Sequence, residues 1–390
     1  MKKIAVLAAM MGAVAAPAYA AGSNVQLYGL IDEGVTHFTG LKPAGTAAAG
    51  QTVSSTGLSS GVEAGSRIGV KGTEDLGGGV STIFDVETGF CAAGLNQDGT
   101  TTQSGANQTF CTGGGFMQRQ AWVGLAGDFG VVKGGRFFTQ AFINEIDIDP
   151  FGAGLTGQIS NLSLYANYGW YRTSQTIEYT TPKLSGFQGV AAYSFAPGNA
   201  GTVPTVSGAG SNVSRSWTLD GQYGNGPVVV GLNYSTFTNH YDNAVGVNDG
   251  ALKLWQVYGS YNFRVAKLAA MYEQSKQDYF SGNDKFWLLG VTVPVGQGAI
   301  LASYTQNKSD LVANGSTALP AGTAKQYALG YTYNLSKQTD LYVSYAHLSN
   351  DSASASQSGT SFAVGDSTDG FSGVTGQGSS GFAVGILHQF

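Results

Sequence analysis

Charged residues and long apolar segments are both scarce in this chain of 390 residues. Asp, Glu, Lys and Arg make up 11% of it, against about 25% in ordinary soluble domains. Beyond the amino terminus no window of about 18 uncharged apolar residues occurs, which excludes a helical membrane protein. The 19 Lys and Arg against 24 Asp and Glu give a formal net charge of −5, so the basic footprint of a nucleic-acid-binding protein is also missing.

The apolar run at the amino terminus has the form of a secretory signal peptide. Lys2 and Lys3 precede apolar residues from Ile4 onward, and Ala18-Tyr19-Ala20 is a small-x-small cleavage site. The run is shorter than the about 20 residues that cross a bilayer as a helix. We therefore expect residues 1–20 to be removed on export and residues 21–390 to form a single domain. Loss of two lysines leaves 17 basic against 24 acidic residues, a net charge of about −7.

Residue patterns of catalytic and metal sites are missing as well. The four histidines stand apart, without the spacing of a metal site: they are His37, His240, His347 and His388. The glycine-rich stretches follow turn chemistry and not the phosphate-binding pattern. No nucleophile has His and acid partners on adjacent predicted strands, as a barrel phospholipase or protease would need. The sequence therefore predicts no enzyme, no cofactor and no metal.

Glycine, aromatic residues and alternation are what the chain has in abundance. It contains 59 Gly, 20 Tyr and 20 Phe but 9 Pro. From Val25 it repeats about ten alternating residues followed by a turn or a longer loop, a pattern typical of transmembrane β-barrels. Between Lys325 and Leu335, for example, Tyr327 and Leu329 alternate with polar or small residues. Sixteen such strands can be counted along the chain.

Alternation alone does not separate a membrane barrel from a soluble β-sandwich, because sandwich strands also alternate. The placement of aromatic residues favours the barrel, since several lie near predicted strand ends, as in the girdles at the two membrane interfaces. They are Trp217, Tyr223, Tyr234, Trp255, Phe263, Trp287 and Tyr333.

The connections between predicted strands alternate in length, which gives the topology. Short links such as Asp128-Phe129 are expected to be periplasmic turns. The long loops cover residues 38–64, 91–115, 139–171, 197–213, 237–251, 276–284, 308–324 and 349–379. We therefore expect an all-β protein of the cell outer membrane, a 16-stranded antiparallel β-barrel with both ends on the periplasmic side. The strand that ends at Phe390 should pair with the strand from Val25 to Phe38 to close the barrel.

The two cysteines, Cys91 and Cys111, flank the second long loop. An exported chain meets an oxidising compartment, so a disulfide between them is expected, with a free thiol or a metal ligand as the alternatives. Such a bond would stabilise by about 3 kcal/mol in the chain-entropy model.

The sequence resembles the trimeric general porins of Gram-negative outer membranes, in their beta-proteobacterial form. The stretches that carry the resemblance are VQLYGLID at 25–32, SRIGVKGTEDLGGG at 66–79, RQAWVGL at 119–125, LGY at 329–331, LSK at 335–337 and the terminal Phe390. It runs over the whole mature chain, and the second stretch is the most specific. It implies a water-filled channel for passive diffusion of small hydrophilic solutes and ions. Its implied partners are two further copies in a homotrimer, lipopolysaccharide and other outer-membrane lipid, and the barrel-assembly machinery, which recognises Phe390.

The resemblance also implies a pore constriction formed by the third long loop, residues 139–171. In the family this loop folds into the lumen and carries an acid-Pro/Glu-Phe-Gly turn, and here the turn is Asp149-Pro150-Phe151-Gly152, close to that pattern but not identical. Glu145, Asp147 and Asp149 are the expected acidic side of the constriction. Alternatively, these acids belong to a solvated turn.

The basic side of the constriction follows from strand parity. With Ile68, Val70, Trp122, Ile177 and Tyr179 facing lipid, the residues facing the lumen are Arg67, Arg119 and Arg172. The three positions match, in order, a basic ladder that faces the loop acids in the family. Charges of opposite sign across a narrow aqueous gap produce a transverse field that favours polar solutes. Pairing within the wall or binding of lipopolysaccharide phosphate is the alternative for each arginine.

Other residues have weaker assignments. Asp32, Asp85 and Glu87 have lumen parity, and they either bias the pore towards cations or hydrate its wall. Arg136 is expected to pair with a neighbouring loop, and Glu74 and Asp75 to form the first tight turn. Small positions on the lipid side would allow close approach of subunits: Gly29, Gly69, Gly124 and Gly385.

The ion preference stays open, because the net acidity favours cations at the mouths whereas the arginines favour anions inside. Two functional alternatives to a passive diffusion channel also stay open, a substrate-selective channel and a surface adhesin or structural barrel with a closed lumen.

Overall fold

The computed structural model describes residues 24–42, 51–93, 117–195, 215–242, 247–278, 280–310, 312–313, 322–351, 361–365 and 373–390. The predicted signal peptide and Cys111 lie outside these ranges. Within them, no helix has the length and hydrophobicity needed to cross a membrane.

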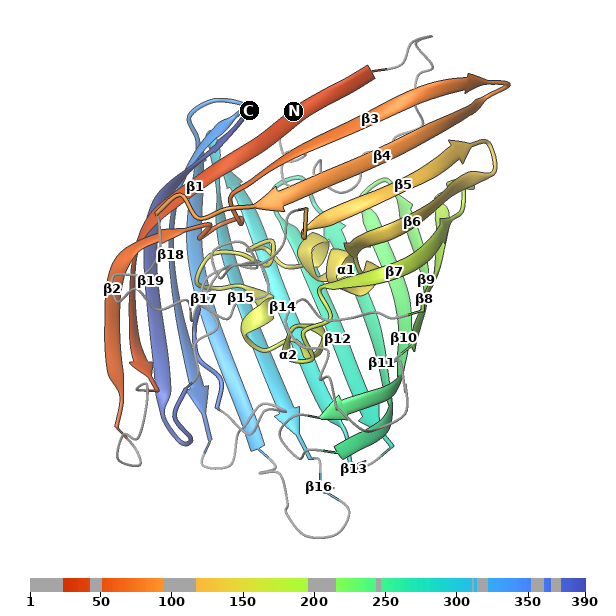
Figure 1. Cartoon of the computed structure of the whole chain (residues 1–390). Coiled ribbons are helices and arrows are strands. Elements are labelled where there is room, and N and C mark those ends of the chain that lie inside the picture. Colours follow the sequence, from red (N-terminus) through yellow and green to blue (C-terminus); the bar gives the residue numbers. More distant parts are fainter. Residues whose placement is uncertain are drawn as a thin grey trace.

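The chain forms a closed antiparallel β-barrel (Figure 1). Its strands are β1 (Asn24–Leu41), β2 (Val53–Ser60), β3 (Arg67–Gly77), β4 (Val80–Gly89), β5 (Gln120–Gly127), β6 (Gly130–Phe138), β7 (Arg172–Thr180), β8 (Phe187–Ser194), β9 (Arg215–Asn225), β10 (Val228–Asp242), β11 (Val247–Asn262), β12 (Lys267–Gln277), β14 (Asp284–Val295), β15 (Gly298–Ser309), β17 (Gly322–Asn334), β18 (Thr339–Asn350) and β19 (Gly378–Gln389). Two short strands, β13 (Phe280–Ser281) and β16 (Val312–Ala313), pair with each other outside the barrel sheet.

The barrel has sixteen strand positions although seventeen strands belong to its sheet. β1 pairs with β3 from Asn24 to Leu30 and with β2 from Glu33 to Leu41, so β2 and β3 are two parts of one interrupted strand. The predicted count of sixteen is therefore confirmed. The predicted first loop, 38–64, is too long, because β1 continues to Leu41 and β2 pairs with it.

β1 and β19 close the barrel, as predicted. Their register runs from Leu30 opposite Gln389 to Thr39 opposite Ser380. Phe390 continues this pairing, since its backbone N–H donates to the Gly29 carbonyl and its carbonyl accepts from the Gly29 N–H, both at 3.0 Å. The terminal residue is thus hydrogen-bonded to the first strand.

Side chains alternate between an apolar outer face and a largely polar inner face. In β18, Leu341, Val343 and Tyr345 are exposed, whereas Tyr342 and Ser344 between them are buried. Successive residues of a strand point to opposite faces, so this alternation gives a lipid side and a lumen side. Most predicted facings agree with it.

Trp122 is a predicted lipid-facing residue that the structure places on the inner side. Its neighbours Val123 and Leu125 are the exposed apolar residues of β5, at 56% and 45%. The Trp122 indole N–H donates to Gln120 Oε1 at 3.2 Å, and Lys133 Nζ lies 5.3 Å from its ring. The prediction was wrong because an aromatic side chain was assigned to lipid, whereas the two aliphatic residues set the parity of this strand.

Gly29, Gly69, Gly124 and Gly385 were expected to allow close approach of a second subunit. In the structure each of them packs against residues of the same barrel wall. A Cβ on Gly69 would meet the Tyr28 ring, one on Gly385 the Tyr342 ring, and one on Gly29 the Phe390 ring. Gly124 is likewise closed by the neighbouring strand, at Lys133 Cβ. Gly69, Gly124 and Gly385 have inward parity, since their neighbours Ile68, Val123 and Val384 are exposed, so the expected lipid-side position of these three was wrong. Gly29 has the predicted outward parity and is covered by the Phe390 ring.

The tight turns lie where they were predicted, with one shift. Asp128 and Phe129 join β5 to β6. Glu74 and Asp75, however, lie within β3, and the first turn is made by Gly78 and Gly79 with φ of 64° and 80°. Positive φ is accessible to glycine without strain, which places this turn after the two acids.

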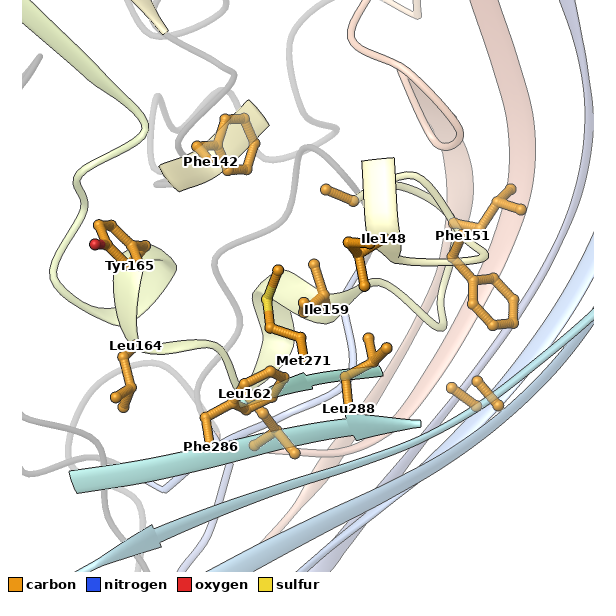
Figure 2. Packing of buried hydrophobic residues seen from close by; sticks show 14 of the residues in the cluster. Phe142, Ile148, Phe151, Ile159, Leu162, Leu164, Tyr165, Met271, Phe286 and Leu288 are labelled. Carbon is orange, nitrogen blue, oxygen red and sulfur yellow. The ribbon is translucent and has the colours of Figure 1, made fainter. Parts of the chain in front are cut away.

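Residues 139–171, between β6 and β7, form a loop inside the barrel that is called the inner loop below (Figure 1). It contains α1 (Gln140–Ile148), η2 (Ile159–Asn161) and α2 (Leu164–Asn167). Thr139 caps α1 by accepting the Phe142 N–H. The apolar residues of the inner loop pack on inward residues of β12 and β14, among them Met271, Phe286 and Leu288 (Figure 2). These contacts keep the loop against the β9–β18 side of the wall.

Candidate functional site

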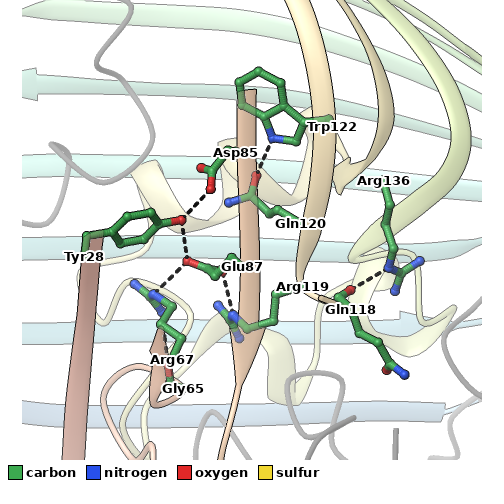
Figure 3. Close-up of polar contacts among 10 residues, drawn as sticks. All are labelled: Tyr28, Gly65, Arg67, Asp85, Glu87, Gln118, Arg119, Gln120, Trp122 and Arg136. Atoms are coloured by element: carbon green, nitrogen blue, oxygen red, sulfur yellow. Dashed lines mark hydrogen bonds and ion pairs between the residues drawn. The ribbon is translucent and has the colours of Figure 1, made fainter. Parts of the chain in front are cut away.

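The three predicted arginines meet on one side of the barrel, around β3, β4 and β7. Glu87 of β4 lies between two of them, with its Oε2 3.3 Å from Arg67 Nε and its Oε1 2.7 Å from Arg119 Nε (Figure 3). The Arg172 guanidinium lies 4.0 Å from the centre of the Phe138 ring. Arg119 and Arg172 are each 3% exposed. The structure therefore gathers these residues into one largely buried basic cluster.

The inward position of the Arg119 side chain does not follow from strand parity. It precedes β5, and its backbone N–H donates to the Glu87 carbonyl at 3.2 Å. By strict alternation with Val123 it would point outward, but the chain has not yet entered the regular strand. Its inward placement agrees with the prediction, although the parity argument used for it was faulty.

A second group of charged and aromatic residues continues the cluster towards the short turns. The Tyr28 hydroxyl donates to Asp85 Oδ1 at 2.7 Å and to Glu87 Oε2 at 3.2 Å, and Lys71 Nζ lies 5.0 Å from the Tyr28 ring. Farther along, Lys133 Nζ lies 3.0 Å from Glu178 Oε1. Sequence reasoning did not single out Tyr28, Lys71, Lys133 or Glu178. The alternation along their strands was the signal that could have found them.

The wall formed by β3 to β7 and the adjoining Tyr28 carries more positive than negative charge. Its inward basic residues are Arg67, Lys71, Arg119, Lys133 and Arg172, and its inward acids are Asp85, Glu87 and Glu178. Five positive and three negative groups leave an excess of two positive charges among these residues. Lys71 is exposed, whereas Arg119, Arg172 and Glu87 are buried and act on the lumen through the field that they produce. This group is called the basic wall below.

The three acids of the inner loop do not share one environment. Asp147 is exposed to water, whereas Glu145 is fully buried and Asp149 is 5% exposed. The Asp149 carboxylate accepts the backbone N–H groups of Phe151, Ala153 and Ile159, at 3.1, 3.1 and 2.8 Å, and so shapes its own turn. The expected position of Glu145 and Asp149 along the aqueous constriction does not agree with this burial.

Glu145 points to the barrel wall near Glu273 of β12. Burial raises the pKa of the Glu145 carboxyl well above its ordinary value, and the negative charge of Glu273 raises that pKa further. Glu273 itself accepts hydrogen bonds from the Gln256 side chain at 2.7 Å and from the Leu164 N–H at 2.8 Å. Glu145 is therefore enclosed between the inner loop and the barrel wall, and it does not line the lumen.

The remaining candidates are structural. Arg136 Nε donates to the Gln118 carbonyl at 2.6 Å, and its Nη1 donates to Ser174 Oγ at 2.7 Å, which confirms the predicted pairing with a neighbouring segment. Asp32 has the predicted inward parity but is fully buried and hydrogen-bonded within the wall. It does not line the pore. Of the three uncertain acids, Asp85 and Glu87 belong to the basic wall.

Cys91 is disulfide-bonded. Its expected partner, Cys111, lies outside the described residues, so the pairing itself stays a prediction. In the part of the chain that the structure describes, no three His, Cys, Asp or Glu residues form a group that could hold a metal ion.

Comparisons with known proteins agree with this architecture. Residues 5–353 match the family model of the Gram-negative porins. An outer membrane porin of Bordetella pertussis is 31% identical over 383 residues, which cover 89% of this chain and 94% of that protein. The structure of an anion-selective porin from Comamonas acidovorans has a TM-score of 0.70 and 27% identity, over 95% of this chain and all of the other. The trimer form of OmpT from Vibrio cholerae, at 16% identity, shares the fold with a TM-score of 0.63 over 95% of this chain and all of its own.

The closed barrel with its inner loop, the basic wall and these relationships lead to one conclusion. The chain belongs to the Gram-negative porin family, and it is a 16-stranded outer-membrane barrel that forms a passive channel for small solutes and ions.

Proposed function

We propose that the constriction of this channel lies between the inner loop and the basic wall, and that it favours small hydrophilic anions over cations. The observation that carries the proposal is the excess of two positive charges on the basic wall. Asp147 is the water-exposed acid among the three candidates on the loop, and the Lys267 ammonium donates to its backbone carbonyl at 2.8 Å. The loop therefore does not neutralise the wall.

Electrostatics favours this selectivity despite the net acidity of the chain. Charges that line a narrow passage with low-dielectric walls act strongly on a passing ion, whereas charges on exposed loops are screened within about 8 Å at physiological salt. The basic wall should therefore outweigh the loop acids. The anion-selective porin from Comamonas acidovorans supports the proposal as a relative of similar fold.

The permeability ratio of chloride to potassium, measured on planar bilayers, tests the proposal in two variants. Lys71→Ala removes an exposed ammonium of the basic wall, and Asp147→Asn removes the exposed loop acid. The two variants change the net charge by one unit in opposite directions. We expect the first to lower the ratio and the second to raise it. If neither variant changes the ratio, the constriction lies elsewhere. Conductance that saturates with one solute would indicate a substrate-selective channel, and absence of conductance would indicate a closed barrel.

We also propose that the chain assembles as a homotrimer through the outer face of β1 and β2. An aromatic girdle follows the outer face on the long-loop side from β8 to β18. It consists of Tyr193, Trp217, Tyr234, Trp255, Tyr272, Trp287, Tyr304, Tyr327 and Tyr345. Phe382 continues the girdle on β19, but on β1 and β2 the corresponding positions are Val35 and Leu58. A gap in an interfacial girdle is expected where protein replaces lipid.

The polarity of the same face supports a protein contact. The outward His37 of β1 is exposed and hydrogen-bonded to Thr56 at 2.6 Å, and Glu33 shares its strand parity, with its carboxylate oxygens buried. Ionisable residues are unfavourable against lipid tails. In a cysteine cross-linking experiment, Val35→Cys should give linked subunits with a short thiol reagent, whereas Leu232→Cys on the girdled side should not. Equal cross-linking at both positions would contradict this interface.

A third proposal concerns the lipid partner. On alternate strands a cation stands at the outward position directly beyond the girdle, at Arg215, Lys253, Lys285 and Lys325, with Lys276 and Lys308 one outward step farther. Among the described residues, Asp278 pairs with Lys253 and Asp310 with Lys285. We infer that this belt contacts the phosphates of lipopolysaccharide. Arg215→Gln with Lys325→Gln should reduce the lipopolysaccharide that copurifies, and Lys183→Gln at the short-turn end should not. If the double variant copurifies with the same amount of lipopolysaccharide, these cations do not bind its phosphates.

The processing and assembly signals are proposals too. We infer that residues 1–20 are removed on export, which amino-terminal sequencing of the protein from outer membranes tests. A mature chain that begins elsewhere would refute the cleavage site. The predicted recognition of Phe390 by the barrel-assembly machinery is tested by its deletion, described below.

A further inference from the structure

The strand formed by β2 and β3 is interrupted where it faces the middle of β1. The register passes from Arg67 opposite Leu30 to Ser60 opposite Glu33, so six residues of the strand stand against two of β1. These six residues, 61–66, are called the wall insert. An interruption of this size in a transmembrane strand leaves backbone groups that need other partners.

Asp32 on β1 supplies those partners. Its Oδ2 accepts the N–H groups of Glu63 and Ala64 at 2.6 and 2.7 Å, and its backbone carbonyl accepts the Gly61 N–H at 2.7 Å. Its own N–H donates to Ser66 Oγ at 3.0 Å. Asp32 is fully buried. A carboxylate offers acceptor sites for several donors at once, so this one side chain determines the shape of the insert.

The wall insert in turn contacts the far end of the inner loop. The Leu155 N–H donates to the Val62 carbonyl at 2.7 Å, and both residues are almost fully buried. At Gly154 the two backbones touch so closely that a Cβ would lie 1.7 Å from the Glu63 carbonyl oxygen. Residues 152–155 of the inner loop are called the loop apex.

The backbone of the loop apex requires such support. Ala153 and Leu155 both have φ of 56°, in the left-handed region. This conformation is unfavourable for a non-glycine residue, and it persists where surrounding contacts enforce it. Asp149 holds the Ala153 N–H on the loop side, and the wall insert holds Leu155 on the wall side.

The wall insert also contacts the basic wall. Arg67 Nη1 donates to the Gly65 carbonyl at 3.1 Å (Figure 3). One six-residue segment therefore joins the loop apex on one side to an arginine of the basic wall on the other.

We propose that Asp32 is a positioning residue of the pore. Asp32 determines the fold of the wall insert. The insert in turn sets the position of the loop apex and the orientation of Arg67. These two determine the width and the charge of the passage between the inner loop and the basic wall. This inference rests on the constriction proposed above. The other attachments of the inner loop, such as Tyr165 to Asn233 at 2.9 Å, are independent of Asp32. Loss of Asp32 should therefore release the apex and not the whole loop.

The test combines an accessibility measurement with an electrical one. In the intact barrel, the buried thiol of Leu155→Cys should react slowly with a hydrophilic maleimide. Adding Asp32→Ala should increase the reaction rate of this thiol. It should also lower the voltage at which single channels close and broaden the distribution of their conductance. The relative change in the unfolding temperature of the barrel should be smaller than the relative change in the thiol reaction rate. An unchanged thiol rate and unchanged single-channel behaviour would overturn the proposal.

Two further variants decide the question if Asp32→Ala does not assemble. Gly154→Ala displaces the apex through its Cβ without altering Asp32 and should reproduce the electrical changes, whereas Gly221→Ala, in β9 with open space around its Cβ, should behave as the unmodified protein. Tyr342→Phe removes the hydroxyl that donates to Asp32 Oδ1 at 2.7 Å and should give a weaker form of the same changes. Normal single-channel behaviour of Gly154→Ala would refute the proposal that the wall insert positions the loop apex. The thiol reaction rate reports the position of the loop apex. It therefore tests the role of Asp32 even if the basic wall does not determine ion selectivity.

Discussion

Glu87 is the residue whose replacement tests the basic wall most severely. Its carboxylate pairs with Arg67 and Arg119 and accepts the Tyr28 hydroxyl, and the side chains of Glu87 and Arg119 are each 4% exposed. Glu87→Gln keeps the shape of the side chain but removes the negative charge between two arginines. The variant is expected to be less stable and more anion-selective.

The size of the effect follows from burial. Removing one partner of a buried ion pair destabilises by about 3–5 kcal/mol, because the other charge is left uncompensated. Glu178→Gln is the matched control, since its partner Lys133 is 19% exposed and can be hydrated. Because Lys133 is more accessible to water than Arg119, and Glu178 pairs with one cation where Glu87 pairs with two, we expect a smaller loss for Glu178→Gln than for Glu87→Gln. Without Glu87 the excess on the basic wall rises from two positive charges to three.

Thermal unfolding of the detergent-solubilised barrel, followed by tryptophan fluorescence, measures the first effect. Sulfate should partly restore the stability of Glu87→Gln, because an anion can take the place of the lost carboxylate between the arginines. The chloride-to-potassium permeability ratio measures the second effect. If Glu87→Gln unfolds like Glu178→Gln and leaves the ratio unchanged, the charge arrangement of the basic wall is not as described.

Three further predictions concern closure and the second long loop. Gly29→Val should impair closure, because a Cβ at this position would lie 2.5 Å from the Phe390 ring. We expect a destabilisation of about 1–3 kcal/mol, seen as a lower unfolding temperature, and unchanged unfolding would refute the packing. Deletion of Phe390 should reduce the amount of folded barrel in the outer membrane far more than the conductance of the channels that do form, and normal assembly would contradict its role. Cys111→Ser should lower the heat stability of the assembled protein, by up to about 3 kcal/mol in the chain-entropy model, and an unchanged melting pattern would exclude a bond to Cys91 that stabilises the assembly.

The fold could be predicted from the sequence because a transmembrane barrel repeats one simple rule. Outward residues must be apolar and inward ones need not be, so strands such as β17 and β18 show their faces directly. The inner loop was bounded correctly, since β6 ends at Phe138 and β7 begins at Arg172. These boundaries follow from where alternation stops and resumes.

The remaining features depend on contacts that a single sequence does not encode locally. Residues 61–64 were assigned to the first long loop, because their contacts with Asp32 span about thirty positions of the chain. Glu145 and Asp149 were expected in the lumen because the alternation rule does not apply to an irregular loop. Glu145 is enclosed against the wall beside Glu273, and Asp149 is held in its own turn by backbone N–H groups. Trp122 shows that even a strand can mislead where an aromatic residue packs against an inward lysine.

The reversal potential of single channels of the unmodified protein, in a gradient of potassium chloride, tests whether the basic wall makes the channel anion-selective. The basic wall, with five positive and three negative inward groups, predicts a potential that corresponds to preferential passage of chloride. Arg119→Ala, measured in the same way, should move the potential towards zero. A potential that corresponds to potassium preference, or one that Arg119→Ala leaves unchanged, would contradict the account.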